Sequence, residues 1–179
     1  KELAFTPELI VVNDFHKHPA YINAISESIR EQWALNDRAQ LLVFSYHGIP
    51  QRYVDKGDPY YEQCHETTRL IAKDLNLDDN QWRLVFQSRF GKDPWLQPYC
   101  DKTMKSLPSE GINSIDILCP GFSADCLETI EEIQRENKSY FIGAKGKTFN
   151  YIPCLNDSDD HINALVIIIN QHLSTWINA

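Results

Sequence analysis

Three glutamates at intervals of four residues, Glu128, Glu132 and Glu136, form the most chemically suggestive pattern in this sequence of 179 residues. Side chains four residues apart lie on one face of an α-helix, so the three carboxylates should line one side of a helix. Clustered carboxylates can bind a divalent cation or accept protons. The alternative is an exposed acidic face on an acidic protein, and the spacing alone does not separate the two readings.

His47 is the second residue with chemical potential. It directly follows the apolar run at residues 41–46, and Gly48 and Pro50 then break the strand. Neutral imidazole binds borderline metals such as Fe(II) and also accepts protons. A lone histidine at a strand end is more often structural, so its role depends on whether it faces the glutamates. Trp95 is a candidate wall for a flat ligand, or else a loop side chain anchored on the core.

Strands and helices must alternate to position these residues. Apolar runs predict buried strands at residues 9–15, 41–46, 82–87 and 115–119, with a short fifth strand at 140–143. Helical periodicity or start signals predict helices at residues 19–35, 59–75, 96–107, 126–137 and 157–179. Strands that are apolar throughout and joined by helical crossovers are typical of a parallel sheet. The predicted fold class is therefore α/β, a Rossmann-like three-layer α/β/α sandwich with a parallel four-stranded sheet.

The predicted topology brings the candidate residues together. In open parallel sheets, ligands bind outside the carboxyl ends of the strands. The loops that leave this edge are residues 47–57, 88–95 and 120–125. Glu128 lies one helical turn beyond the third loop, so we expect it to converge with His47 and with the loop that carries Trp95.

Composition narrows the class of protein. A net charge of −8 argues against nucleic acid as a partner, because phosphate binding needs clustered Lys and Arg. The longest purely apolar run, residues 164–169, is too short to span a bilayer, and residues 1–15 lack the pattern of a secretory signal. Five cysteines without a CxxC pair suit reduced thiols. We therefore expect a cytoplasmic domain.

Three long motifs resemble those of the ferrochelatase family. They are SYHGIPQRYVDKGDPYY at 45–61, FQSRFGKDPWLQPY at 86–99 and CPGFSADCLETIEEI at 119–133, and YIPCLN at 151–156 fits as well. The similarity covers nearly the whole chain but only the second half of that two-domain enzyme. The resemblance implies that residues 1–156 form the second, chelatase-like α/β domain. It also implies that residues 157–179 form a closing helix, which in the family packs on the first domain, a partner absent from this sequence.

The resemblance implies insertion of Fe(II) into protoporphyrin IX to give protohaem, with release of two protons. Iron and porphyrin are then substrates, and no cofactor is required because the reaction is not redox. The side chains expected to touch the substrates fall into three sets: catalytic and metal-binding His47 and Glu128, metal-binding Glu132 and Glu136, and porphyrin-binding Trp95, Tyr46 and Ile49.

Some expectations remain open at this point. Cys126 stands where many family members have histidine, which leaves its part in metal handling undecided. The chain lacks the cysteine-rich tail of the animal enzyme, so we expect no iron–sulfur cluster. Transient contact with the inner membrane surface is expected for the family, since protoporphyrin is poorly soluble. The alternatives are a related tetrapyrrole chelatase, a non-catalytic porphyrin or haem carrier, and a half that binds nothing without its partner.

The predicted last helix has a strongly apolar face. Its members are Ile162, Leu165, Val166, Ile169, Leu173 and Trp176, with Ile168 and Ile177 at the margins. An exposed apolar patch of this size is unusual on a monomer. Because the earlier helices should already cover both faces of the sheet, we expect this helix to pair with a second copy of the chain, as a homodimer or a swap.

Overall fold

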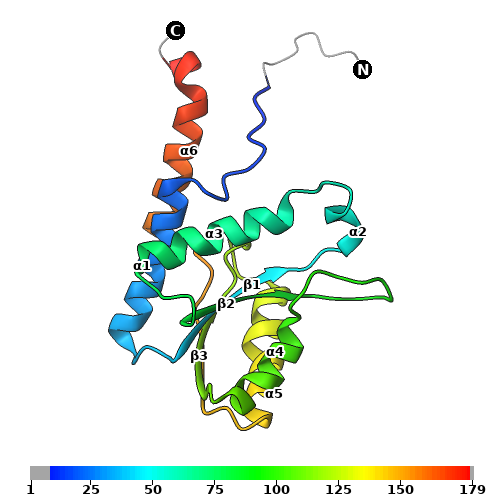
Figure 1. Ribbon diagram of the computed structural model, residues 1–179. Coiled ribbons are helices and arrows are strands. Elements are labelled where there is room, and N and C mark those ends of the chain that lie inside the picture. The colour runs from blue at the N-terminus through cyan, green and yellow to red at the C-terminus, as the bar shows by residue number, and fades with distance from the viewer. Residues whose placement is uncertain (1–8, 178–179) are drawn as a thin grey trace.

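Four parallel strands form the sheet at the centre of the molecule (Figure 1). The computed structural model describes residues 9–177, and for residues 174–177 only the helical backbone. The strands are β1 (Leu41–His47), β2 (Trp82–Gln87), β3 (Ser114–Leu118) and β4 (Thr148–Tyr151), in the order β2-β1-β3-β4. Each neighbouring pair is parallel. The predicted class and the parallel four-stranded sheet are confirmed.

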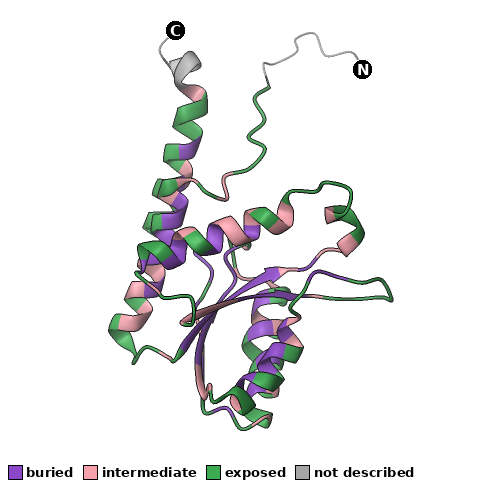
Figure 2. Ribbon diagram, in the orientation of Figure 1, coloured by how far each residue is buried: buried purple, intermediate pink, exposed green. Residues whose placement is uncertain are grey.

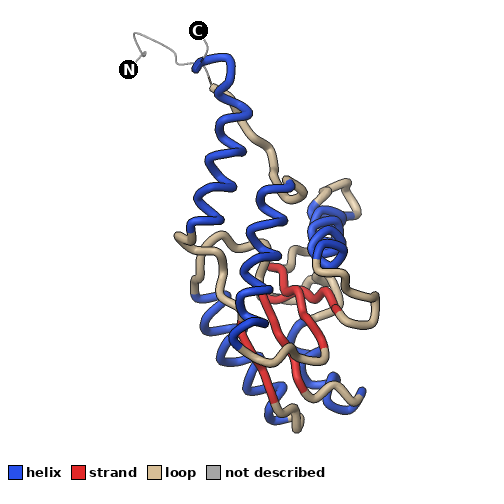
Figure 3. Tube along the Cα trace, turned by 90° about the vertical axis from the view of Figure 1, so that its left-hand side faces the viewer, coloured by secondary structure: helices blue, strands red, loops and turns tan. Residues whose placement is uncertain are grey.

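Helices cover both faces of this sheet, as the side view in Figure 3 shows. One face carries α1 (Pro19–Leu35) and α3 (Tyr60–Asp74), and the other carries α4 (Cys100–Ser106), η2 (Glu128–Asn137) and α5 (Lys138–Gly143). Three further elements are the short α2 (Gln51–Val54), the one-turn η1 (Leu107–Glu110) and the closing α6 (Asp159–Ile177). The arrangement is the expected three-layer sandwich.

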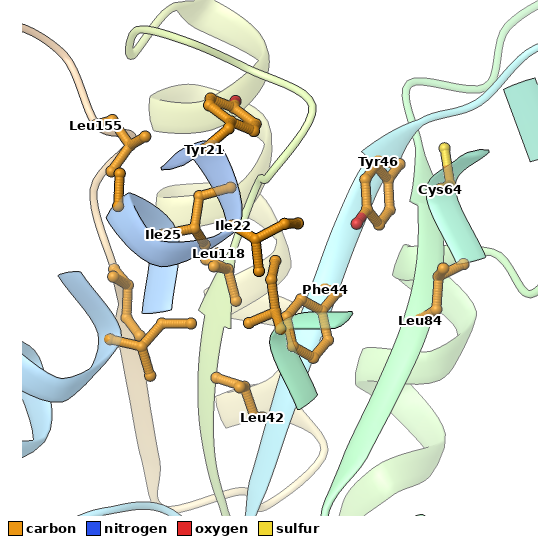
Figure 4. Close-up of a cluster of buried hydrophobic side chains, with 14 of the residues drawn as sticks. Tyr21, Ile22, Ile25, Leu42, Phe44, Tyr46, Cys64, Leu84, Leu118 and Leu155 are labelled. Atoms are coloured by element: carbon orange, nitrogen blue, oxygen red, sulfur yellow. The ribbon is translucent and has the colours of Figure 1, made fainter. Parts of the chain in front are cut away.

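Alternating side chains of β1 build two separate cores. Phe44 and Tyr46 point toward α1 and α3, into the cluster drawn in Figure 4, whereas Val43 belongs to the cluster beneath α4 and η2. Figure 2 shows the sheet as the most deeply buried part of the chain. Because β1 is covered on both faces, most of its side chains are apolar. This explains why β1 was predictable from its apolar run.

The predicted strand at residues 9–15 is wrong. The segment has no regular structure, and Leu9 and Val11 are 82% and 67% exposed. The edges of the sheet are β2 and β4, so the segment pairs with neither. An apolar run predicts burial only if something covers it, and of the apolar residues in this one only Phe15 packs on the described core, against Tyr21.

The fourth strand lies in a stretch that was predicted to be a loop. In β4, Phe149 pairs with Ile115 of β3 and is buried, so a long-range partner makes a strand of a locally weak sequence. The short strand predicted at residues 140–143 is wrong, since these residues belong to α5. There Phe141 is completely buried and packs near Phe149, with ring centroids 6.1 Å apart.

The helix predicted at residues 96–107 begins later, at Cys100. The preceding residues run beside β2, where the carbonyl of Pro98 accepts a hydrogen bond from the main-chain N–H of Phe86 at 2.8 Å. This pairing holds the segment extended until α4 can start. The short helix α2, at residues 51–54, was not predicted.

α6 lies beside α1, as Figures 1 and 3 show, so the closing helix has a partner within its own chain. It buries His161, Ala164 and Ile168. The predicted apolar face is therefore partly wrong, because Ile168 was placed at its margin. The stripe of Ile162, Val166 and Ile169 remains about half exposed. Trp176 lies outside the side chains that the structure describes. Within residues 9–177, no helix is both long and apolar enough to cross a bilayer.

Candidate functional site

The ends of β1 and β2 meet at the carboxyl edge of the sheet. His47, the last residue of β1, pairs in register with Gln87, the last residue of β2. The main-chain N–H of Gly48 donates to the carbonyl of Gln87 at 2.9 Å, and Pro50 bridges to Trp95. The first two of the predicted loops thus lie against each other, as expected from the parallel topology.

The tautomer of the neutral His47 ring follows from its hydrogen bond. Nδ1 lies 2.6 Å from the carbonyl oxygen of Gly48. A carbonyl can only accept, so Nδ1 carries the proton and, in the neutral ring, Nε2 keeps its lone pair. The hydroxyl of Tyr60 donates to the His47 carbonyl at 2.8 Å and fixes the strand end. His47 is half-buried and can present Nε2 as a base or a metal ligand.

The close approach of the two loops requires glycine at position 48. A Cβ there would lie 3.0 Å from the carbonyl oxygen of Gln87 and 3.2 Å from Cε3 of Trp95. Trp95 itself is only 5% exposed, and the 72% exposed Phe90 packs over it with ring centroids 4.8 Å apart. The exposed aromatic surface over Trp95 is therefore that of Phe90, which was not among the predicted site residues.

The other two predicted porphyrin contacts lie on the α3 side of β1. Tyr46 is 2% exposed, and its hydroxyl lies 2.9 Å from the hydroxyl of Thr68. Ile49 is half-buried against the same core cluster. Tyr46 also lines a cavity of about 170 Å³ that extends to Tyr60 and Cys64. The nearly buried Tyr46 thus borders this cavity.

The acidic residues lie on a π-helix, η2, and the predicted α-helix is wrong here. Two side-chain amides bond to its main-chain carbonyls: Gln87 Nε2 donates to Glu128 at 2.7 Å, and Asn137 Nδ2 donates to Glu132 at 2.8 Å. Neither bond can be inferred from the periodicity of the sequence. The three glutamates still lie on one side of the helix, because a spacing of four residues keeps side chains on one side of an α-helix and of a π-helix alike. π-helical segments are rare and often occur at functional sites.

Glu128 is exposed at the start of η2 and lies within electrostatic reach of His47. Its pKa is lowered from the usual glutamate value, chiefly by a hydrogen bond with the Cys126 side chain and also by its own main-chain N–H. The His47 ring contributes to the same lowering of the pKa. The structure thus places both residues at the carboxyl edge of the sheet, where Gln87 pairs in register with His47 and donates to the main-chain carbonyl of Glu128. Cys126 contacts the Glu128 carboxylate.

Glu132 and Glu136 differ in their surroundings, although they occupy equivalent places in the sequence pattern. The half-buried Glu132 carboxylate accepts hydrogen bonds from the main-chain N–H of Ser88 at 2.6 Å and from its hydroxyl at 2.5 Å. Glu136 is exposed, and its carboxylate bonds to none of the residues that the structure describes. Both line a surface hollow of about 170 Å³, together with Asn137.

Asp125 anchors the start of η2 and was not among the predicted site residues. It accepts hydrogen bonds from the Tyr151 hydroxyl at 2.6 Å, from Thr129 at 3.0 Å and from Asn156 Nδ2 at 2.9 Å. Burial alone would raise its pKa, but the bonds from Asn156 and Tyr151 outweigh burial and lower the pKa. The signal was present in the sequence, since Tyr151 and Asn156 begin and end the YIPCLN motif.

The described part of the chain contains no group of three or more His, Cys, Asp or Glu side chains arranged to hold a metal ion.

The parallel sheet, with a histidine and an acidic helix at its carboxyl edge, defines an α/β domain whose site can handle cations and protons. The chain belongs to the ferrochelatase family, since the family model described as Ferrochelatase matches residues 1–173. Similar curated proteins are the ferrochelatases of Hydrogenovibrio crunogenus (55% identical over 95% of this chain and 45% of the relative) and Marinobacter nauticus (50% over 95% and 46%). The ferrochelatase of Vibrio cholerae is 47% identical over 94% of this chain and 53% of the relative. The chain spans about half the length of the curated relatives it matches.

Proposed function

We propose that this chain is the metal-handling half of an enzyme that inserts Fe(II) into protoporphyrin IX and forms protohaem. Membership of the ferrochelatase family gives the reaction class. The observation that supports the assignment to this half is the link through Gln87, which pairs in register with His47 and donates to the main-chain carbonyl of Glu128 at the carboxyl edge of the sheet. A base and a carboxylate at one edge can serve both substrates of the reaction.

The chemistry assigns a task to each of these residues. Porphyrin nitrogens must lose two protons before they can bind iron, and Nε2 of His47 is the unprotonated nitrogen that can accept one. Fe(II) must shed its water ligands, which imidazole and carboxylate can replace stepwise. Iron keeps its oxidation state throughout, so we propose that the reaction needs no redox cofactor.

The porphyrin ring would lie against the aromatic surface beside His47. Trp95 is the predicted wall, and its burial behind Phe90 suggests that Phe90 makes the outer contact while Trp95 supports it. Ile49 is accessible enough to touch the ring edge, whereas Tyr46 would act from within the cavity beneath β1. These four side chains are our proposed porphyrin site.

Glu136 is the best candidate for delivering iron to this site. Its exposed carboxylate makes no hydrogen bond with the described residues and lies on the same helix as Glu128. Hard cations favour carboxylate oxygens that carry full charge. The resemblance gave Glu132 the same role, but its carboxylate is already bonded to Ser88.

We also propose that a complete enzyme contains a first half, which covers the exposed stripe of Ile162, Val166 and Ile169 on α6. In its absence, a second copy of this chain would cover the stripe. The relatives' greater length and the 48%, 47% and 51% exposure of these side chains support this arrangement. We place the enzyme in the cytoplasm, with transient contact at the inner membrane surface, where poorly soluble porphyrin would be collected.

The test is to mix the chain with protoporphyrin and ferrous iron under anaerobic conditions, with and without a separately expressed first half, and to record absorption spectra. We expect the protohaem spectrum when both halves are present. Porphyrin binding without metal insertion by the assembled halves would instead indicate a carrier, and insertion of a different metal or into a different tetrapyrrole would indicate a related chelatase.

A further inference from the structure

Glu132 has the hydrogen bonds of an anchored carboxylate. Three donors reach it from two consecutive residues: the N–H of Ser88 at 2.6 Å, the hydroxyl of Ser88 at 2.5 Å and Nε2 of Gln87 at 3.4 Å. A carboxylate offers about four acceptor positions, so most of its capacity is already used. An iron ion bound there would have to displace these donors. The carboxylate is therefore poorly suited to passing ions along the helix.

The backbone of Ser88 is bent to make this contact. Its φ is +64°, in the left-handed region that residues other than glycine seldom adopt. Such a conformation persists when the surrounding structure holds it in place, and it is often found at functional sites. Here the two bonds to Glu132, one from the main chain and one from the side chain, hold it.

Gln87 extends the same connection to the strands. Its Oε1 accepts from the hydroxyl of Ser45 at 2.8 Å, and its Nε2 donates to the main-chain carbonyl of Glu128 at 2.7 Å. Gln87 is 3% exposed and pairs in register with His47. One buried side chain thus links the strand that ends in His47 to the first residue of η2.

We propose that Gln87, Ser88 and Glu132 form a positioning clamp, which fixes Glu128 relative to His47, and that Glu132 is not an ion-carrying ligand. The proposal rests on the proposed function, in which His47 and Glu128 receive the metal. It assigns different roles to two glutamates that occupy equivalent positions in the sequence pattern: Glu132 holds the helix in place, and Glu136 attracts the ion.

The direction in which Ser88→Ala changes the metal affinity distinguishes the two roles of Glu132. If Glu132 were a metal ligand, Ser88→Ala would remove one of the donors that occupy its carboxylate and would strengthen metal binding or leave it unchanged. If Glu132 is part of a clamp, Ser88→Ala should weaken metal binding at His47 and Glu128. Glu132→Gln should weaken it as well, and the double variant should be little worse than Glu132→Gln alone, because both changes break the same connection.

The experiment is a titration of the chain with Co²⁺, followed through the ring resonances of His47 by NMR. We expect His47→Ala to abolish the response, Ser88→Ala and Glu132→Gln each to weaken binding about 10-fold, and the control Glu131→Gln to have little effect. Glu131 is exposed on the same helix and pairs with Arg135. Unchanged or tighter binding in Ser88→Ala would overturn the clamp.

A second measurement separates failure of the clamp from failure of the proposed function. If the wild-type chain gives no Co²⁺ response at His47, the proposed metal site is wrong. The clamp is then judged by a double-mutant cycle between Ser88 and Glu132 on the unfolding equilibrium. Non-additivity of about threefold or more supports the clamp, and additive effects contradict it.

Discussion

The side-chain amide of Gln87, at the end of β2, donates a hydrogen bond of 2.7 Å to the main-chain carbonyl of Glu128, the first residue of η2. The two residues are 41 positions apart in the chain. Because Gln87 also pairs in register with His47, this one bond relates the end of the sheet to the acidic helix. The site therefore depends on a buried amide that has no charge and no place in the chemistry.

Gln87→Leu should destabilise the chain. The substitution leaves the hydroxyl of Ser45 and the carbonyl of Glu128 without their partner, and unpaired buried polar groups cost about 1–3 kcal/mol each. Urea unfolding would measure the loss. Gln134→Leu, at an exposed position of the same helix, is the matched control and should be close to neutral. Equal stabilities for the two variants would show that the Gln87 bonds contribute little.

Asp125→Ala should remove a pH-dependent part of the stability. Burial alone would raise the pKa of Asp125, but the hydrogen bonds from Asn156 and Tyr151 lower it below the usual aspartate value. A carboxyl group with a lowered folded-state pKa stabilises the fold above its unfolded pKa, and this contribution disappears as pH falls through the folded value. Below about pH 4, the wild-type chain should therefore lose stability more steeply than the variant does.

Unfolding titrations at several pH values would test this prediction. Asp157→Ala, at an exposed position, is the control and should follow the wild-type pH dependence. Parallel curves for wild type and Asp125→Ala would mean that the Asp125 carboxylate is not stabilised by the fold.

Much of the fold could be predicted from the sequence. The strands and helices that were predicted correctly are those whose own residues show an apolar run or a helical period. β1 is apolar at most of its positions, and α1 buries Ile22, Ile25 and Ile29 at the helical spacing. β4 was missed because its strand character comes from pairing with β3. The strand at residues 9–15 was wrongly predicted because the described chain leaves residues 9–12 exposed. Both failures concern contacts with distant or absent segments.

The candidate site was predictable to the same extent. Parallel topology alone brings His47 and Glu128 to one edge, so their convergence followed from the order of the elements. The different surroundings of Glu132 and Glu136 could not be predicted, because they depend on the left-handed backbone at Ser88. Likewise, the cover that Phe90 gives to Trp95 is a packing detail without a periodic signal.

Glu136→Gln should raise the apparent KM for Fe(II) several-fold in the complete enzyme while leaving kcat nearly unchanged. A carboxylate that attracts the ion, without taking part in the chemical step, contributes to capture rather than to turnover. Glu131→Gln removes a similar charge from the same helix but should have a smaller effect, since Glu131 is paired with Arg135. A fall in kcat at unchanged KM would assign Glu136 to the chemical step instead.

Val166→Glu should make the isolated chain more monomeric. The exposed stripe on α6 has Val166 at its centre, and a charge there opposes burial against a second copy. Asn163→Glu adds the same charge at an exposed polar position of α6 and should leave self-association unchanged. Light scattering over a range of concentrations would compare them. A wild-type chain that stays monomeric throughout would contradict pairing through this helix.

Anaerobic insertion of Fe(II) into protoporphyrin by the complete enzyme is the decisive measurement, made on the wild type and on His47→Ala. We expect the variant to lose at least about 100-fold in kcat, the usual contribution of a positioned base. Porphyrin affinity, measured separately by fluorescence quenching, should stay nearly unchanged because the aromatic wall is intact. Insertion by His47→Ala at close to the wild-type rate would contradict the assignment of His47 as the base or metal ligand.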